Sequence, residues 1–241
     1  MTTKTTALVT GANKGIGLAI CQGLGALGWR VGVGARDAGR RDAAVDALQG
    51  EGVDAFGVPL DVTDRQSVAS AAALLEDQEG RLDVLVNNAA ITGGAPQEPT
   101  LVDPETVLRV ADTNVVGVIR VTNAMLPLLR RSASPRIVNI SSSVGSLTLQ
   151  TAQRQAVGPV SAAYSPTKTY LNAVTIQYAK ELADTPILVN MGCPGYVDTD
   201  LNGHQGTRTV EQGAVIAIRL ATLPDGGPSG TYSNEDGPLP W

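Results

Sequence analysis

The sequence predicts an α/β fold in which a doubly wound parallel sheet of about seven strands is covered by helices on both faces. Short apolar runs alternate with longer segments that have helical periodicity. The short runs are continuously apolar, which is typical of parallel strands buried on both faces. A glycine-rich turn joins the first run to the first helical segment. The length of 241 residues suits one domain, 1–241, with a core that needs no disulfide bonds.

The first four expected strands are separated by three helices. Apolar residues recur at helical spacing in the first helix, Gly50 and Gly52 end the second, and Asp64 is the expected N-cap of the third. The expected strands are residues 7–10, 31–35, 55–60 and 84–87. The expected helices are residues 16–27, 42–49 and 65–79.

The second half of the chain continues the same alternation. Asp103 and Pro104 begin a long helix that is predicted to continue to Arg130, although Gly117 and Pro127 weaken its middle and its end. The elements expected after it are strand 136–140, helix 164–182, strand 187–191, helix 210–220 and strand 231–233. Right-handed crossovers place the carboxyl ends of parallel strands on one edge of the sheet, so a ligand is expected there.

Composition excludes several classes of function. Charged residues make up 17% of the chain, the net charge is −5, and the basic residues form no cluster, so we expect no nucleic-acid binding. Two cysteines, Cys21 and Cys193, and one histidine, His204, are too few for a zinc site or a disulfide framework. Cys21 is expected in the core and His204 in a loop. The chain shows no membrane-spanning run and no secretory signal, which indicates a cytoplasmic protein without a membrane partner.

The first turn has the glycine pattern of a nucleotide-binding loop, Thr10-Gly11-Ala12-Asn13-Lys14-Gly15-Ile16-Gly17. Gly11 allows the sharp turn, Gly15 allows the backbone to approach a pyrophosphate, and Gly17 allows the helix to pack closely on the strand. The helix N-terminus offers free N–H groups to an anion. A glycine-rich turn without a ligand is the alternative, but the position between a strand and a helix favours a nucleotide.

The end of the second strand bears on which cofactor would bind. An acidic residue at this place would bind the ribose hydroxyls of NAD. The chain instead has Ala35 and Arg36, with Lys14 in the preceding loop, which suits the 2′-phosphate of NADP. Asp37 follows directly, so NAD stays open as the alternative cofactor, as does the reading that both cations are simply solvated.

These motifs, together with those that follow, resemble the short-chain dehydrogenase/reductase family, which has a Rossmann-type fold. The resemblance covers essentially the whole chain, and the order and spacing of the motifs make it specific. Downstream of the glycine loop, the matching segments are Leu60-Asp61-Val62, Asn87-Asn88-Ala89-Ala90, Thr113-Asn114, Ile137-Val138-Asn139-Ile140-Ser141-Ser142, Tyr164-Ser165-Pro166-Thr167-Lys168 and Pro194-Gly195-Tyr196-Val197-Asp198-Thr199. Ala90 stands where the family has glycine.

The resemblance implies a catalytic set of Asn114, Ser142, Tyr164 and Lys168. Tyr164 would exchange a proton with the substrate oxygen, and Lys168, four positions later on the same helix face, would favour the phenolate. Ser142 would steady the developing alkoxide, and its choice over its serine neighbours follows the register of the family motif. Asn114 would hold a water that links Lys168 to solvent. The family register also gives Tyr164 and Lys168 contacts with the cofactor.

The other cofactor contacts that the resemblance implies extend over the whole carboxyl edge of the sheet. They are Gly11, Asn13, Lys14, Gly15, Ile16, Gly17, Arg36, Asp61, Val62, Asn88, Ala89, Pro194, Gly195, Val197 and Thr199. Because Pro166 lacks an N–H group, the helix that carries Tyr164 is expected to begin close to Tyr164, with Ser161 or Ser165 as its cap.

The substrate is expected to contact a rim formed by residues 144–159, predicted as a polar loop, and by residues 196–208. Asn13-Lys14-Gly15-Ile16-Gly17 and the tail from Pro194 to Trp241 are similar to the carbonyl reductases of the family. Aliphatic residues and few charges near Ser142 favour a small or medium uncharged ketone or aldehyde. The predicted activity is NADPH-dependent carbonyl reduction. A lyase or epimerase on the same scaffold and a non-enzymatic nucleotide sensor are the alternatives, and both a monomer and a homo-oligomer built through residues 104–130 and 164–182 stay open.

Overall fold

The computed structural model describes residues 4–152 and 157–241, and in this part of the chain seven parallel strands form one sheet in the order β3-β2-β1-β4-β5-β6-β7. The strands are β1 (Thr6–Thr10), β2 (Arg30–Ala35), β3 (Asp54–Pro59), β4 (Val84–Asn87), β5 (Arg136–Ile140), β6 (Leu188–Gly192) and β7 (Tyr232–Ser233). The order runs outward from β1 in one direction and from β4 in the other. The predicted doubly wound parallel sheet is confirmed, and its switch point lies between β1 and β4.

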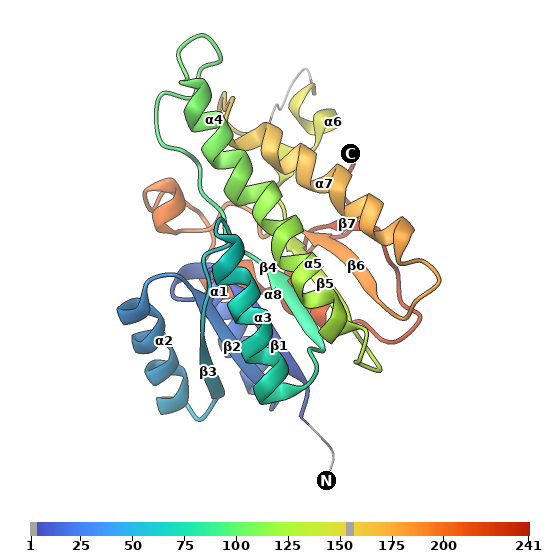
Figure 1. The fold of residues 1–241 in the computed structure, drawn as a ribbon. Helices are drawn as coiled ribbons and strands as arrows, with labels where there is room; N and C mark the ends of the chain where they lie inside the picture. Colours follow the sequence, from blue (N-terminus) through green and yellow to red (C-terminus); the bar gives the residue numbers. More distant parts are fainter. Residues whose placement is uncertain (1–3, 153–156) are drawn as a thin grey trace.

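Helices cover both faces of the sheet, and Figure 1 shows α3, α5 and α7 crossing in front of it. The front helices are α3 (Arg65–Glu79), α5 (Gly117–Leu129) and α7 (Tyr164–Glu181), preceded in the chain by the shorter α4 (Pro104–Ala111) and α6 (Leu147–Gln150). The helices on the other face are α1 (Gly15–Ala26), α2 (Ala38–Gly50) and α8 (Val210–Ala221).

The core lies in two layers, one on each side of the sheet. Ala7 and Val9 of β1 belong to the cluster that includes α1, α2 and α8, whereas Leu8 belongs to the cluster that includes α3, α5 and α7. All five residues of β1 are buried. This burial on both faces explains why the strands read as continuous apolar runs, and Cys21 lies in the core as predicted.

The helix expected over residues 104–130 is present from Pro104 to Leu129, but it is not α-helical throughout. A π-helical turn, Asp112–Val116, separates α4 from α5, and Gly117 N–H donates to the carbonyl of Asp112. A side chain at Gly117 would lie 3.0 Å from Val62 Cγ2, so the start of α5 packs tightly against the connection between β3 and α3. Such turns insert one residue into a helix and often occur at functional sites.

Helix boundaries elsewhere follow local caps. α3 has the predicted bounds, because Asp64 accepts from Gln66 N–H at its start and Gly80 adopts a left-handed conformation at its end. α2 begins four residues earlier than expected, since Asp37 acts as its N-cap. Among the helices of the described chain, none has the combination of length and hydrophobicity needed to cross a membrane.

Candidate active site

The glycine loop between β1 and α1 has the geometry that its sequence predicts. Gly11 has a φ of +64°, and a side chain there would lie 2.9 Å from the Ala89 Cα. A side chain at Gly17 would lie 2.4 Å from the Gly11 carbonyl oxygen, so only glycine permits this packing. No side chain caps the N-terminus of α1. The first-turn N–H groups are therefore left to bind an anion.

A cleft of about 820 Å³ opens above this loop at the carboxyl edge of the sheet. Most of the predicted cofactor residues line it: Gly11, Asn13, Lys14, Gly15, Ile16, Gly17, Arg36, Asp61, Val62, Asn88, Ala89 and Thr199. Pro194, Gly195 and Val197 are not among its lining residues. A side chain at Gly195 would lie 2.7 Å from Arg208 Cδ, and Val197 packs against Gly213. Both residues therefore help to position the segment that leads to Thr199.

Lys14, Arg36 and Arg40 line the cleft together with Asp37, and these three basic residues are here called the cation-lined end. Arg40 was missed in the sequence, because it precedes residue 42, where the second helix was expected to begin. Asp37 accepts a hydrogen bond from the Arg40 backbone N–H at 2.9 Å, so its carboxylate caps α2. Lys14 forms an ion pair with Asp200.

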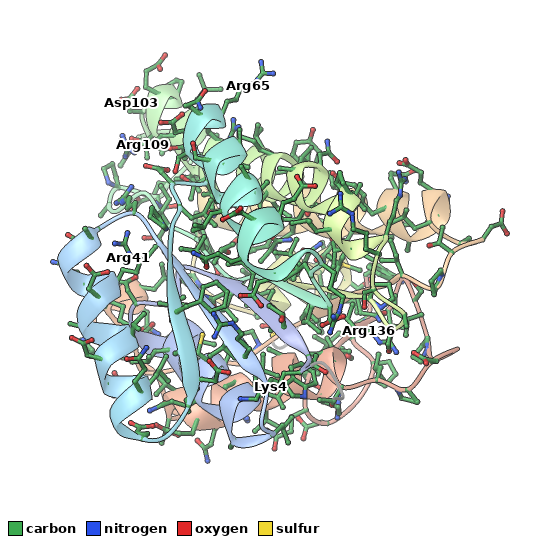
Figure 2. The ribbon with its side chains drawn as sticks, turned by 60° about the horizontal axis from the view of Figure 1, so that its bottom comes forward. Lys4, Arg41, Arg65, Asp103, Arg109 and Arg136 are labelled. Atoms are coloured by element: carbon green, nitrogen blue, oxygen red, sulfur yellow. The ribbon has the colours of Figure 1, made fainter. Side chains whose placement is uncertain are left out.

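Arg41 and Arg109 differ in how they relate to the cleft, and Figure 2 labels both. Arg41 pairs with Asp42 at 2.8 Å and is not among the lining residues. Arg109 on α4 does line the cleft, together with Thr113, and no sequence motif indicated it.

Asp61 and Asn88 line the cleft, and each forms hydrogen bonds with neighbouring residues. The Asp61 carboxylate accepts hydrogen bonds from Thr63 N–H at 2.9 Å and Thr63 Oγ1 at 2.7 Å. Partial burial acts to raise the pKa of Asp61, but these hydrogen bonds and the nearby arginines lower it overall. The Asn88 amide donates to the carbonyls of Thr10 at 3.0 Å and Gly11 at 3.2 Å. Asn88 therefore ties β4 to the glycine loop.

The other end of the site, here called the buried end, contains the buried Asn114 and Lys168 and the half-buried Ser142 and Tyr164. α7 begins at Tyr164 as predicted, with Pro166 in its first turn, where a missing N–H costs no helical bond. Its N-cap is Ala163 rather than a serine, but the Ser161 Oγ accepts from Tyr164 N–H at 3.3 Å.

Lys168 lies one turn after Tyr164, and its Nζ is 5.6 Å from the centre of the Tyr164 ring. Lys168 is 3% exposed, and its ammonium donates to the Ile140 carbonyl at 2.7 Å. Burial lowers the pKa of Lys168 from 10.5 to about 8. Burial also raises the pKa of the Tyr164 phenol, and Cys193 raises it further, whereas a hydrogen bond with the Ser142 side chain acts in the opposite direction.

Asn114 connects the buried end to the cleft. It lies in the π-helical turn, is 1% exposed, and accepts from Ile91 N–H at 2.9 Å. Its amide group donates to the Ile91 carbonyl at 2.9 Å and to Thr167 Oγ1 at 3.1 Å. Ile91 lines the cleft, and Thr167 lies between Tyr164 and Lys168 in α7. Ser142, Tyr164 and Lys168 themselves are not among the lining residues of the cleft.

The structure describes only part of the segment 144–159 that was expected to form the substrate rim. Residues 144–152 contain the end of a short 3-10 helix, Ser143–Gly145, and α6, so this part of the rim is largely helical where a polar loop was predicted. Residues 153–156 lie outside the described residues. In the second rim segment, the exposed ring of His204 contacts Asp198 at 2.7 Å and Asp200 at 2.8 Å.

A family model for the short chain dehydrogenases matches residues 5–209 of the chain. The chain belongs to this family. Its members are oxidoreductases, and the resemblance expected from the motifs is confirmed, including its carbonyl reductase-like character.

Relatives of this short-chain dehydrogenase are found among plant and animal proteins. It is 35% identical to a short-chain dehydrogenase/reductase from Saponaria officinalis, over 94% of this chain and 92% of the relative. It is 33% identical to the NADPH carbonyl reductase 1 of Bos taurus, over 98% of each chain. The solved structure of the NADPH-bound carbonyl reductase from chicken fatty liver superposes with a TM-score of 0.86 at 28% identity, covering 99% of this chain and 100% of that one.

Proposed function

We propose that this short-chain dehydrogenase is an NADPH-dependent carbonyl reductase that converts a small or medium uncharged ketone or aldehyde into an alcohol. The observation that carries the proposal is the buried end of the site, where Tyr164 and Lys168 share one helix face and Asn114 bonds to Thr167 between them. The NADPH-bound carbonyl reductase that superposes on the chain supports the same cofactor.

The residues of the cleft fit a nicotinamide dinucleotide. Gly11 and Gly17 leave no room for side chains, and the uncapped start of α1 suits a pyrophosphate. Arg36, Lys14 and Arg40 line this cleft and suit the 2′-phosphate of NADPH, and Asp37, which also lines the cleft, is engaged as the cap of α2. Asp61, Val62, Asn88, Ala89 and Thr199 would hold the remainder, with Tyr164 and Lys168 at the nicotinamide ribose. When bound, the cofactor supplies the hydride.

The protein supplies the proton and the electrostatic setting. Burial raises the pKa of Tyr164, so its phenol keeps its proton at neutral pH and can donate it to the substrate oxygen as a general acid. Lys168 carries a positive charge below its pKa of about 8 and stabilises the phenolate that this transfer leaves. Ser142 would donate a hydrogen bond to the same oxygen. Asn114 would hold the water through which the proton is replaced.

The test is the Tyr164→Phe variant, assayed with NADPH and an uncharged ketone. Loss of the general acid is expected to lower kcat by about 10²- to 10⁴-fold, because that is the usual contribution of proton transfer. NADPH binding, followed by nicotinamide fluorescence, should persist. A variant that retains the wild-type rate would reject Tyr164 as the acid. Purified protein that carries tightly bound nicotinamide and leaves its redox state unchanged during turnover would instead support a lyase or epimerase.

A further inference from the structure

The last strand of the sheet brings Tyr232 against the backbone of Ser142. The Tyr232 Oη donates a hydrogen bond to the Ser142 carbonyl at 2.5 Å. Tyr232 is 2% exposed, so water does not compete for this bond. The catalytic roles proposed above do not include this tyrosine.

Ser142 lies in the short connection between β5 and the 3-10 helix Ser143–Gly145. Hydrogen bonds within this segment fix the position of Ser142 only in part. β5 ends at Ile140, and the last sheet bond runs from Ser141 N–H to the Gly192 carbonyl at 2.8 Å. Ser142 is extended, with φ −158° and ψ 149°, and the 3-10 helix begins at the next residue. Its carbonyl also accepts from Gly145 N–H at 2.8 Å. That bond fixes the carbonyl relative to its own turn, whereas the Tyr232 bond fixes it relative to β7.

The residues on either side of Ser142 are held by side chains from two other elements. Ser141 Oγ donates to Asn172 Oδ1 of α7 at 2.5 Å. Ser143 N–H donates to the Cys193 sulfur at 3.1 Å, just beyond the end of β6. Tyr232 supplies the middle contact of the three, at the residue whose hydroxyl is predicted to meet the substrate.

Tyr232 is in turn held by the C-terminal residues. The ring of Trp241 lies against the Tyr232 ring, with centroids 5.5 Å apart and planes inclined by 33°. The Tyr232 carbonyl accepts from Leu239 N–H at 2.9 Å, and the Trp241 carbonyl accepts from Thr148 N–H at 2.9 Å. Thr148 is in α6, so the C-terminus joins the expected substrate rim to Tyr232.

We propose that Tyr232 is a positioning residue for Ser142 and that Trp241 keeps the Tyr232 ring in place. The inference rests on the proposed reductase function, in which the Ser142 hydroxyl binds the substrate oxygen. Tyr232 acts through the Ser142 peptide group, whose orientation sets where that hydroxyl points. A small displacement of such a group lowers the rate of the chemical step.

The first test compares Tyr232→Phe with Tyr178→Phe. Tyr178 is a matched control, because it is also buried and its Oη donates to Asn123 Oδ1 at 2.7 Å, away from Ser142. Tyr232→Phe is expected to lower kcat and kcat/KM for the ketone together by about tenfold, because an interaction made in the transition state is weakened. NADPH affinity should stay within about twofold. Tyr178→Phe should leave all three values within about twofold. An unchanged kcat in Tyr232→Phe would overturn the inference.

The second test reads the Ser142 peptide directly and needs no turnover. The amide nitrogen of Ser143 shares a peptide group with the Ser142 carbonyl, so loss of the Tyr232 bond should shift its NMR signal in Tyr232→Phe and not in Tyr178→Phe. Trp241→Ala should shift the same signal by a smaller amount. If the wild-type protein oxidises NADPH with none of the ketones, the reductase proposal fails, and the Ser143 signal still decides whether Tyr232 holds Ser142. A Ser143 signal unchanged in Tyr232→Phe would overturn the inference even in an active reductase.

Discussion

The two ends of the site hold their charged and polar groups in opposite ways. At the cation-lined end, the Lys14 side chain is 54% exposed and pairs with Asp200, which is similarly exposed. At the buried end, Lys168 is 3% and Asn114 is 1% exposed, and each is hydrogen-bonded within the protein. Exposed pairs contribute little to stability, whereas buried polar groups are costly unless they are satisfied. The exposed end can therefore select a cofactor with little effect on the fold, while the buried end links the chemistry to the packing.

After Tyr164→Phe, this comparison predicts the largest loss of activity for Ser142→Ala. Removing the hydroxyl is expected to lower kcat by about 10²- to 10³-fold, because a donor aimed at developing negative charge contributes that much. Ser143→Ala is the matched control and should retain kcat within about twofold, since the interaction of Ser143 with Cys193 uses its backbone N–H. Steady-state kinetics with NADPH and one ketone measure both. A larger loss in Ser143→Ala would show that the family register has been misplaced by one residue.

The pH dependence of kcat/KM should report the ionisation of the buried Lys168. Because burial lowers the pKa of Lys168 to about 8, its ammonium is present below that pH and is lost as the pH rises through it. The value of kcat/KM for NADPH, which reports groups of the free enzyme, should therefore fall by about tenfold between pH 7 and 9. In Lys168→Arg the charge persists across this range, so the fall should disappear. A wild-type profile that is flat or rising between pH 7 and 9 would contradict the role of Lys168.

The smallest effect is expected at the cation-lined end. Arg36→Ala should raise KM for NADPH by about fivefold, because an exposed charge pair contributes about 1 kcal/mol at most. KM for NADH, which lacks the 2′-phosphate, should not change. Arg41→Ala is the control, since Arg41 pairs with Asp42 and does not line the cleft. Equal effects of Arg36→Ala on the two cofactors would remove Arg36 from phosphate recognition.

Local signals account for most of what the sequence could predict. The glycine loop and the bounds of α3 depend on residues close together in the chain, such as Asp64 and Gly80. The π-helical turn at Asn114 was missed because it depends on tertiary contacts, with Ile91 and with Val62. The spacing of apolar residues along the helix does not predict those contacts.

The same limit applies to the buried end of the site. Tyr164 and Lys168 were predicted because their segment resembles the family motif, and their spacing of four positions places them on one helix face. The Tyr232 contact joins residues 90 positions apart, and no spacing rule connects them. Arg40 was missed because α2 begins four residues earlier than its periodicity indicated. Arg40 therefore lies in the first turn of α2.

The reductase proposal is tested most directly by following nicotinamide absorbance with NADPH and NADH side by side, on a panel of keto esters, aryl ketones and charged keto acids. We expect oxidation of NADPH that is faster than that of NADH, with uncharged ketones turned over best. Binding of NADPH without its oxidation by any ketone of the panel would contradict the proposed function.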